Sequence, residues 1–268
     1  MKLKDRVAII TGGGTGIGKA ISFAFVREGA KIVVAARNLP RLEETVKAIK
    51  AKGGQAIAVQ TDVSDQEQVK RMAARTVEQF GQIDILVNNA ARGTFNNTDV
   101  SDMKLDEWHE SLAANLTGPM LCCREVLKYM IPRRSGNIVN VSSVAGMSGV
   151  PRESPYAASK WGLIGLTETL AIEAGKHNIR VNCISPGATR TQEFDDWVQT
   201  SAKTAGISYD EVMKKLAENN ALKRIAETEE IANCIVFLAS DDSSAMTGHN
   251  LVASCGFHIT HPNMISFD

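Results

Sequence analysis

The chain has 268 residues, enough for one large α/β domain with a substantial core. Its 30 basic and 30 acidic residues balance, so no excess of charge points to nucleic acid or an anionic membrane as a partner. No apolar run has the length of a membrane span, and the first predicted strand begins almost at once, which leaves no room for a signal peptide.

The cysteines and histidines indicate the compartment and argue against a metal. The five cysteines are odd in number and lack Cys-x-x-Cys spacing, a pattern typical of reduced thiols in a cytosol rather than of a disulfide framework. His258 and His261 are the only close pair of histidines, and no carboxylate motif stands beside them. We therefore expect a cytoplasmic protein without a metal site.

Short apolar runs rich in β-branched residues alternate with helical periodicity along the chain. The predicted strands are 6–11, 31–36, 55–60, 84–87, 137–141, 179–184 and 250–253. The predicted helices are 19–27, 40–52, 63–80, 105–131, 156–174 and 228–239. This alternation predicts an α/β fold with a Rossmann-type, doubly wound parallel sheet of about seven strands, helices on both faces, and ligands above the carboxyl ends of the strands.

The domain organisation follows from what the chain lacks. It shows no internal repeat, low-complexity segment or linker, so we expect residues 1–268 to form a single dinucleotide-binding and catalytic domain. The least regular part, at about 188–225, is polar and mixed in composition, which suits a lid over a substrate site.

A glycine-rich turn lies between the first predicted strand and the first predicted helix. Its glycines have the spacing Gly-x-x-x-Gly-x-Gly, and no register here matches Gly-x-Gly-x-x-Gly. Glycines let the backbone approach a pyrophosphate closely, and the free N–H groups of the following helix attract it. We therefore expect a nucleotide at this turn, bound by Gly12, Thr15, Gly16, Ile17 and Gly18.

The end of the second predicted strand indicates which dinucleotide binds. An acidic residue there would bind a ribose 2′-hydroxyl, whereas an arginine suits a 2′-phosphate. This chain reads Ala35-Ala36-Arg37-Asn38, with no acidic residue. Because Arg37 is placed to pair with a phosphate, we predict NADP(H) as the favoured cofactor and NAD(H) as possible; a merely solvated arginine is the alternative.

Tyr156 and Lys160 stand four residues apart at the head of an apolar helical segment, so they share one face of it. A free tyrosine has a pKa of about 10 and is a poor acid or base at neutral pH. A nearby lysine and a positively charged cofactor ring would favour the phenolate, so we expect the pKa of Tyr156 to fall toward the working pH. Two solvated surface side chains would show the same spacing.

Taken together, the motifs of this chain resemble those of the short-chain dehydrogenase/reductase family over essentially its full length, in the branch that includes the 3-oxoacyl reductases. The match is specific because the motifs occur in the family's order and spacing. They are Thr11-Gly12-x-x-x-Gly16-x-Gly18, Asp62, Asn88-Asn89-Ala90, Asn115, Ser143, Tyr156-x-x-x-Lys160 and Pro186-Gly187-x-x-x-Thr191.

The resemblance implies a catalytic tetrad. Tyr156 would be the general acid/base that exchanges a proton with the alcohol or carbonyl oxygen, and Ser143 would hydrogen-bond that oxygen. Lys160 would hold the nicotinamide ribose hydroxyls and lower the pKa of Tyr156, and Asn115 would hold a water in the proton relay. Ser142 is next to Ser143, but alternation along a strand would send the two side chains to opposite faces.

The resemblance also implies contacts with the rest of the cofactor. Asp62 and Val63 would contact the adenine, and Asn89 and Ala90 would line the cofactor groove. The segment after the sixth predicted strand would meet the nicotinamide carboxamide through Pro186, Gly187, Thr189 and Thr191. Tyr156 and Lys160 complete the expected set of cofactor-binding residues.

Two positions depart from the family pattern. The usual glycine after Asn-Asn-Ala is Ala91, which adds a methyl group beside the cofactor. The tail carries Ser254-Cys255-Gly256 where many relatives have Asp-Gly-Gly. Neither position supplies catalytic chemistry, so both would act on subunit packing or on the shape of the site.

The activity that the resemblance implies is an NADP(H)-dependent interconversion of a secondary alcohol and a ketone, by an enzyme that acts on CH–OH groups. One alternative is an enoyl- or dienoyl-thioester reductase of the same fold, which Ala90-Ala91 and Arg37 also suit. Another is a non-catalytic nucleotide-binding sensor. The intact Ser143, Tyr156 and Lys160 favour carbonyl chemistry over both.

The substrate is expected between Tyr156, the loop at 144–155 and the lid. Arg92 and Arg152 are candidates to bind a carboxylate, phosphate or sulfonate group of a small-molecule substrate. Equally, both arginines suit solvation or pairing with lid acids such as Glu193 and Asp195, and the sequence leaves this choice open.

The resemblance further implies a homo-oligomer, a tetramer or a dimer. In the family, tetramers form through the long helix at 105–131, the Tyr156 helix and the last strand. Here the Tyr156 helix is apolar nearly all round, a pattern typical of burial against a partner, through Trp161, Ile164, Leu166 and Leu170.

Overall fold

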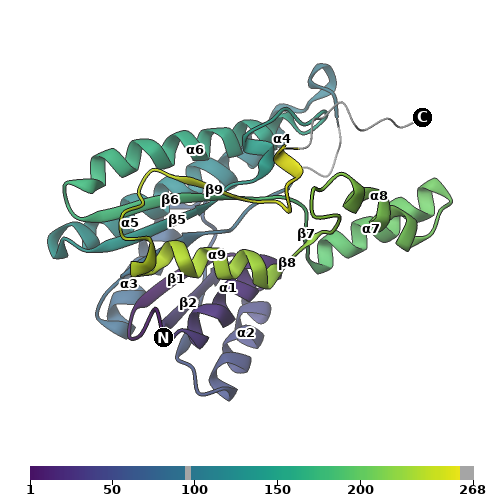
Figure 1. Cartoon of the computed structure of the whole chain (residues 1–268). Helices are drawn as coiled ribbons and strands as arrows, with labels where there is room; N and C mark the ends of the chain where they lie inside the picture. The colour runs from purple at the N-terminus through teal and green to yellow at the C-terminus, as the bar shows by residue number, and fades with distance from the viewer. Residues whose placement is uncertain (94–97, 260–268) are drawn as a thin grey trace.

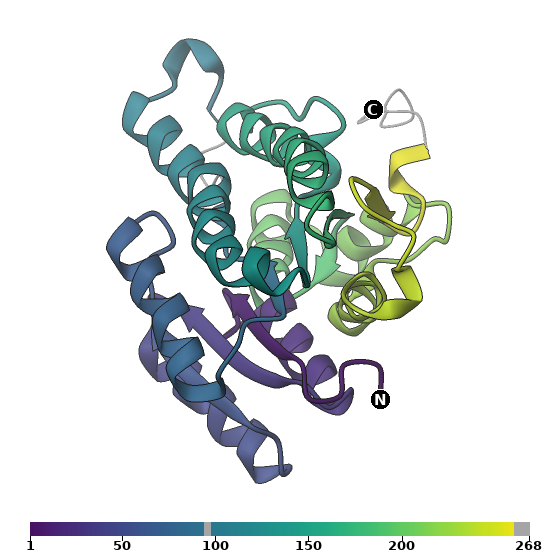
Figure 2. The same cartoon turned by 90° about the vertical axis from the view of Figure 1, so that its left-hand side faces the viewer.

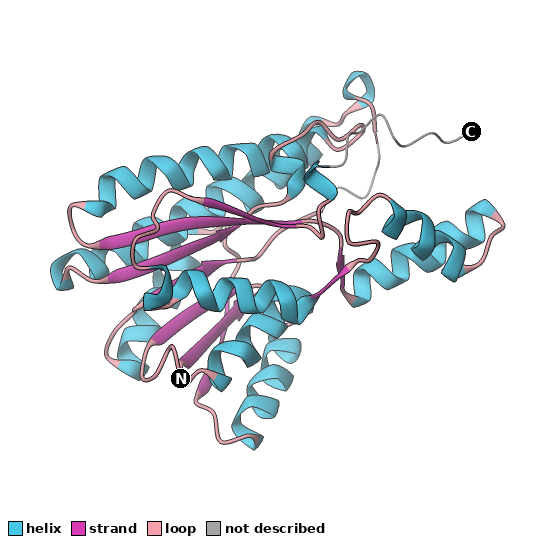
Figure 3. Cartoon of the chain, viewed as in Figure 1, coloured by secondary structure: helices cyan, strands magenta, loops and turns pink. Residues whose placement is uncertain are grey.

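The computed structural model describes residues 1–93 and 98–259 and is built on a seven-stranded parallel sheet in the order β3-β2-β1-β4-β5-β6-β9 (Figures 1 and 3). Each predicted strand is present, with ends that differ by at most two residues. The bounds are β1 (Val7–Thr11), β2 (Lys31–Ala36), β3 (Ala56–Gln60), β4 (Ile85–Asn88), β5 (Gly136–Val141), β6 (Ile179–Pro186) and β9 (Asn250–Ala253). The predicted doubly wound α/β fold is confirmed.

Helices cover both faces of the sheet (Figure 2). One apolar core joins it to α1 (Gly16–Arg27), α2 (Leu39–Ala51) and α9 (Thr228–Ala239). The other joins it to α3 (Gln66–Phe80), α5 (Gly118–Arg133) and α6 (Ser154–Gly175). Neighbouring strand residues serve opposite cores, as Ile9 and Ile10 do, which is why these strands are apolar throughout. Within the described ranges, no helix is long and apolar enough to cross a membrane.

The strand order reverses at β1, which lies between β2 and β4. From β1 the chain winds outward through β2 and β3, and then returns to place β4 on the other side of β1. In open α/β sheets such a reversal leaves a crevice at the carboxyl ends of the two strands, and ligands bind there. This topology positions the site described below.

The predicted helix at 105–131 is not uniform. It consists of α4 (Leu105–Leu112), a π-helical segment (Ala113–Thr117) and α5, which follow one another without a break. The prediction of one uniform helix was wrong, because the spacing of apolar residues does not reveal a single π-helical turn. Asparagine is a poor residue inside an α-helix, and here Asn115 lies within the π segment and bonds to other elements.

The segment at 188–225 is more regular than predicted. It contains β7 (Thr189–Arg190), α7 (Gln192–Ala205) and α8 (Tyr209–Glu218), and β7 pairs in parallel with β8 (Ala226–Glu227). Its polar composition concealed local signals: Gly206 ends α7 in the left-handed region, and Ser208 with Glu211 forms a capping box at the start of α8. In Figure 1 the two helices project from the end of the sheet that bears the site.

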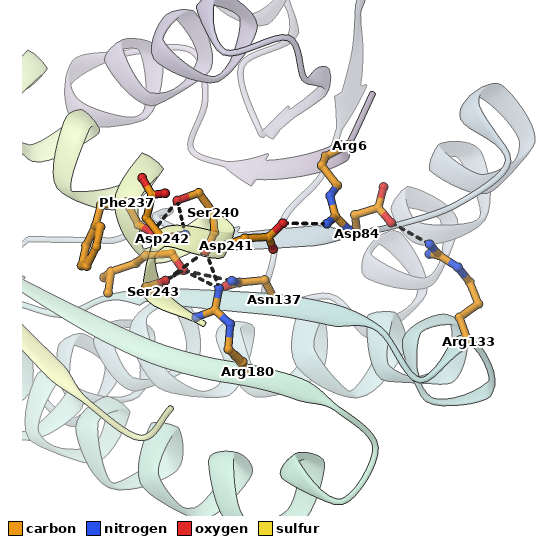
Figure 4. A network of polar contacts seen from close by, with 11 residues as sticks. Arg6, Asp84, Arg133, Asn137, Arg180, Phe237, Ser240, Asp241, Asp242 and Ser243 are labelled. Carbon is orange, nitrogen blue, oxygen red and sulfur yellow. Dashed lines mark hydrogen bonds and ion pairs between the residues drawn. The ribbon is translucent and has the colours of Figure 1, made fainter. Parts of the chain in front are cut away.

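Polar contacts hold the opposite, amino end of the sheet together (Figure 4). The Arg180 guanidinium donates to three backbone carbonyls at and beyond the end of α9, and Asn137 donates to one of them, that of Leu238. Asp84, which is buried at the start of β4, pairs with Arg133 at 2.7 Å. These contacts stabilise the amino end of the sheet, and the ligand site described below lies at its carboxyl end.

Candidate active site

The glycine turn after β1 admits no larger residues at two positions. Gly12 has φ 68°, and a Cβ built on it would lie 2.8 Å from the Asn89 amide nitrogen. A Cβ on Gly18 would lie 2.1 Å from the Gly12 carbonyl oxygen, closer than any real contact. The turn is therefore folded tightly against the end of β4, and its backbone forms a wall without side chains.

Helix α1 begins in this turn with its first N–H groups uncapped. Thr15 occupies the N-cap position, but its side chain accepts no hydrogen bond from the helix, and the first turn contains no acidic residue. By contrast, Asp65 caps α3 and Asn38 caps α2. The start of α1 thus keeps the N–H groups and the positive dipole end that bind a phosphate.

A cavity of about 970 Å³ opens over this turn. Six segments line it: the turn itself, the end of β2 with the start of α2, the end of β3, the end of β4, α4 with the π segment, and the start of α7. The predicted cofactor residues among the lining are Gly12, Thr15, Gly16, Ile17, Gly18, Arg37, Asp62, Val63, Asn89, Ala90 and Thr191. The crevice at the switch point is therefore large enough for much of a dinucleotide.

Two arginines line the cavity at its β2 side. Arg37 follows β2, and Arg41 lies in the first turn of α2, just after the capping residue Asn38. In the described part of the chain, neither guanidinium takes part in an ion pair. Sequence reasoning missed Arg41, although an N-cap asparagine with proline two residues later is a recognisable helix start that places Arg41 in the same turn.

The ends of β1 and β4 are tied together by Thr11 and Asn89. The Asn89 side chain donates to the Thr11 carbonyl at 3.0 Å, and the Thr11 hydroxyl accepts the N–H groups of Asn89 and Ala90, both at 3.0 Å. These bonds fix the floor of the crevice. Ala91 lines the cavity, so its extra methyl group does reach the groove.

Asp62 lies at the adenine end predicted for the cavity, but its carboxylate is already engaged. One oxygen accepts both the N–H and the hydroxyl of Ser64, at 2.9 and 2.6 Å. Its backbone N–H donates to Gln68. Thr61 and Ser64 also line this end and were not predicted.

The predicted carboxamide segment runs from the end of β6 to the start of α7. Thr191 lines the cavity and lies against the glycine turn, because a Cβ on Gly16 would be 3.2 Å from its methyl group. Thr189 donates to the Gly187 carbonyl at 3.0 Å, and Gly187 packs against Ser254. Pro186, Gly187 and Thr189 lie outside the cavity lining.

Ser142 and Ser143, just after β5, point in different directions, as the strand alternation predicted. The Ser142 hydroxyl is buried and donates to the Lys160 carbonyl at 2.9 Å. The Ser143 hydroxyl accepts the Ala145 N–H and lies within hydrogen-bonding reach of the Tyr156 phenol. The structure therefore brings Ser143, rather than Ser142, to Tyr156.

Lys160 lies beneath Tyr156 on α6. Its ammonium is buried, donates to the Val141 carbonyl at 2.8 Å, and lies 5.5 Å from the centre of the Tyr156 ring. Helix α6 starts at Ser154 with Pro155 at its second position, where a missing N–H costs nothing, and this start presents Tyr156 on the first turn.

The expected lowering of the pKa of Tyr156 does not occur in the protein chain alone. Burial of the phenol raises the pKa of Tyr156, the hydrogen bond with Ser143 opposes the rise, and the charge of Glu153 adds to it. Burial also lowers the pKa of Lys160 to about 8. The expectation combined Lys160 with the positive charge of a bound cofactor, so a lowered pKa of Tyr156 stays a prediction for the complex with the cofactor.

Asn115 is fully buried in the π segment and joins three parts of the site. Its amide oxygen accepts the Arg92 N–H at 2.7 Å, and its nitrogen donates to the Arg92 carbonyl and to the Ser159 hydroxyl. Both amide hydrogens are thus used within the protein. A relay water would need the remaining lone pair of the amide oxygen or the backbone carbonyl.

Arg92 and Arg152 both form ion pairs, and neither pairs with a lid acid. Arg92 contacts Glu110 of α4 at 2.6 Å, and Arg152 contacts Asp99 at 3.4 Å. Asp195, which lies on α7 in the segment predicted to be a lid, instead pairs with Arg190 and accepts a hydrogen bond from the Tyr209 hydroxyl.

Of the histidines considered for a metal, His261 lies outside the described residues. The His258 ring bonds to the Ser254 hydroxyl at 2.8 Å. Over 1–93 and 98–259, no cluster of histidine, cysteine and carboxylate side chains is arranged to hold a metal ion.

Comparison with known proteins places this geometry in a family. A family model described as enoyl-(acyl carrier protein) reductase matches residues 12–258. The 3-oxoacyl-[acyl-carrier-protein] reductase FabG of Thermotoga maritima is 37% identical over 248 residues, which cover 92% of this chain and 96% of that protein. The short chain dehydrogenase/reductase astE of Aspergillus oryzae is 35% identical over 259 residues, which cover 96% of each.

A solved structure agrees with these sequence matches. The L-sorbose reductase from Gluconobacter frateurii, complexed with NADPH and L-sorbose, superposes with a TM-score of 0.92 at 32% identity, over 97% of this chain and all of that one. With this similarity over nearly the whole length, the chain belongs to the short-chain dehydrogenase/reductase family, in its 3-oxoacyl reductase-like branch, and is an NAD(P)-dependent enzyme that acts on a carbonyl or alcohol group.

Proposed function

We propose that this protein interconverts a secondary alcohol and a ketone with NADP(H), and that Tyr156 is the general acid/base. The observation that carries the proposal is the convergence of Ser143 and Lys160 on Tyr156 at the end of the sheet that also bears the glycine turn. A phenol, a hydroxyl within its reach and a buried ammonium form a proton-exchanging group with a second hydrogen-bond donor for the same oxygen.

The residues around the cavity fit a dinucleotide. The turn has no side chain at Gly12 or Gly18, helix α1 leaves its first N–H groups free, and Arg37 with Arg41 supplies two cations for a 2′-phosphate. When bound, the nicotinamide supplies or accepts the hydride. The names of two similar proteins, a 3-oxoacyl reductase and an L-sorbose reductase complexed with NADPH, support ketone reduction with this cofactor.

The chain's own groups manage the proton and the position of the substrate. In the direction of reduction, Tyr156 donates a proton to the carbonyl oxygen, while the Ser143 hydroxyl hydrogen-bonds the same oxygen. Burial raises the pKa of Tyr156 in the protein chain, so burial does not remove the proton that the phenol donates in this direction. Lys160 stabilises the phenolate that forms, and Asn115 holds the loop after β4 against α6.

Replacing Tyr156 with phenylalanine tests the proposal. We expect Tyr156→Phe to lower kcat/KM for ketone reduction by at least about a hundredfold, because general acid catalysis contributes about that much or more. The rate is measured as the loss of NADPH absorbance over a panel of ketones. Tyr129→Phe is the matched control and should keep its activity, because Tyr129 lies near the end of α5, close to the Arg133 that pairs with Asp84 at the amino end of the sheet.

If wild type and Tyr156→Phe turned over every substrate equally well, the tyrosine mechanism would be wrong. Titration of NADPH into both proteins separates the chemical step from cofactor binding, since only the chemical step should change greatly.

Reduction of an enoyl thioester is the second candidate, because the matching family model carries that description. The arrangement of Ser143 and Tyr156 around one oxygen favours the ketone, since the oxygen of a ketone is bonded to the carbon that receives the hydride, whereas the thioester oxygen of an enoyl substrate lies two carbons further along. Comparing a 3-oxoacyl thioester with the corresponding enoyl thioester decides between the two reactions. A sensor without catalysis has little support beside a complete tetrad.

We also propose that the protein is a homo-oligomer, a tetramer or a dimer, in the cytoplasm. Large apolar side chains are exposed on α6 and α4, where the family forms its interfaces: Trp161 at 53%, Ile172 at 82% and Leu105 at 66%. The buried cysteines are free thiols, which suits a reducing compartment. Light scattering in solution gives the number of subunits.

A further inference from the structure

Glu153 is the last residue before α6 and lies three residues before Tyr156. Its backbone carbonyl accepts the Ala157 N–H, the first hydrogen bond of the helix, at 2.8 Å. Its carboxylate does not cap the helix in return. Residues three apart at the start of a helix lie on the same side, and the charge of Glu153 acts on the Tyr156 phenol. The carboxylate therefore lies one helical turn from the phenol, at the end of α6 that carries Tyr156.

This carboxylate is half-buried and has no partner among residues 1–93 and 98–259. The nearest cation along the chain, Arg152, pairs with Asp99 instead. The ammonium of Lys160 donates to the Val141 carbonyl. Burial raises the pKa of Glu153, and no positive group offsets it. The adjacent Ser154 hydroxyl is likewise buried and makes no hydrogen bond in the described part of the chain.

A half-buried carboxylate without a partner is costly unless something donates hydrogen bonds to it. No residue in 1–93 or 98–259 does so, whereas a substrate that carries a hydroxyl group beside its carbonyl would donate to this acceptor. A substrate with a carboxylate at the same position would instead meet a like charge. The Glu153 carboxylate would thus discriminate between substrates with a hydroxyl group and substrates with a carboxylate next to the carbonyl.

We propose that Glu153 is a substrate-specificity residue, which selects neutral ketones bearing a hydroxyl group next to the carbonyl and rejects 2-oxo acids. This inference rests on the proposed function, because it names the class of ketone that Tyr156 would protonate. It makes no use of Arg92 or Arg152, since both are engaged in ion pairs with other residues.

Three four-carbon ketones that differ at one carbon test the inference: 1-hydroxybutan-2-one, butan-2-one and 2-oxobutanoate. For the wild type with NADPH, kcat/KM should fall in that order. In Glu153→Gln, the ratio of kcat/KM for the hydroxyketone to that for 2-oxobutanoate should fall at least tenfold. The amide keeps an acceptor for the hydroxyl and removes the charge, so the reduction of 2-oxobutanoate should rise.

Glu168→Gln is the matched control, because Glu168 is an exposed glutamate further along α6. It should leave all three rates unchanged, and thermal unfolding should show that both variants are folded. The inference is overturned if Glu153→Gln leaves the ratio within twofold of the wild type, or if the wild type prefers 2-oxobutanoate. The proposed function fails on a different result, namely no oxidation of NADPH with any ketone, here or in the wider panel.

Discussion

Burial acts in opposite directions on the two ionisable groups at the centre of the site. It raises the pKa of Tyr156 and lowers the pKa of Lys160 to about 8. Each shift favours the neutral form of its own group, because burial disfavours charge. The spacing of the pair was readable from the sequence, but the burial depends on how β5, β6 and α6 pack around it.

The proposed preference for NADP(H) over NAD(H) also depends on single residues. We expect Arg37→Asp to weaken NADPH binding at least about tenfold while changing NADH binding little, because a charge-assisted bond to the 2′-phosphate is lost and a repulsion is added. Arg41→Asp should likewise weaken NADPH binding more than NADH binding. Fluorescence titration of both cofactors measures the effect.

Lys47→Asp is the control for the change in charge, since Lys47 is exposed further along α2 and lies outside the cavity lining. Equal affinity of the wild type for NADPH and NADH would contradict the arginine argument.

At the scale of elements, the turn between β1 and α1 is specified by close approach. We expect Gly18→Ala to destabilise the protein by about 2 kcal/mol or more and to abolish cofactor binding, because its Cβ would lie 2.1 Å from a backbone oxygen that cannot move alone. Chemical denaturation and cofactor titration measure the two effects.

Gly175→Ala at the end of α6 is the matched control, since a Cβ there meets nothing within 4 Å. It should be neutral or stabilise by up to about 1 kcal/mol. Similar losses in the two variants would show that the turn is not specified by packing.

The elements differ in how well the sequence predicted them. The strands are apolar on both faces and bounded by turns, so local pattern located them closely. The π segment and the helices α7 and α8 were missed. The π segment depends on the contacts that Asn115 makes with other elements. The polar composition of helices α7 and α8 conceals their apolar periodicity, although capping residues mark their ends in the sequence.

At the scale of the whole molecule, the two ends of the sheet have separate tasks. The amino end is held by buried polar contacts, and the carboxyl end keeps its backbone groups and its cavity open for ligands. We expect Arg133→Ala to lower the free energy of unfolding by about 2–3 kcal/mol, because it leaves the buried Asp84 carboxylate without its guanidinium. This value already allows for the partial exposure of the arginine.

Arg75→Ala breaks an exposed ion pair with Glu78 and should cost less than about 0.5 kcal/mol. The free energy of unfolding from denaturant titration compares the two variants. A cost for Arg133→Ala as small as that for Arg75→Ala would mean that solvent reaches Asp84.

The glycine turn, the Tyr156–Lys160 spacing and the alternation of strands and helices were readable without coordinates, because each is a local pattern set by covalent spacing. The partners of Asn115, the ion pairs of Arg92 and Arg152, and the cavity wall that contains Arg41 came only from the tertiary structure. These features join residues far apart in the chain, so packing decides them. The carboxylate of Glu153 belongs to this second group, since the fold decides that Arg152 pairs with Asp99 and that no other cation of 1–93 or 98–259 pairs with Glu153.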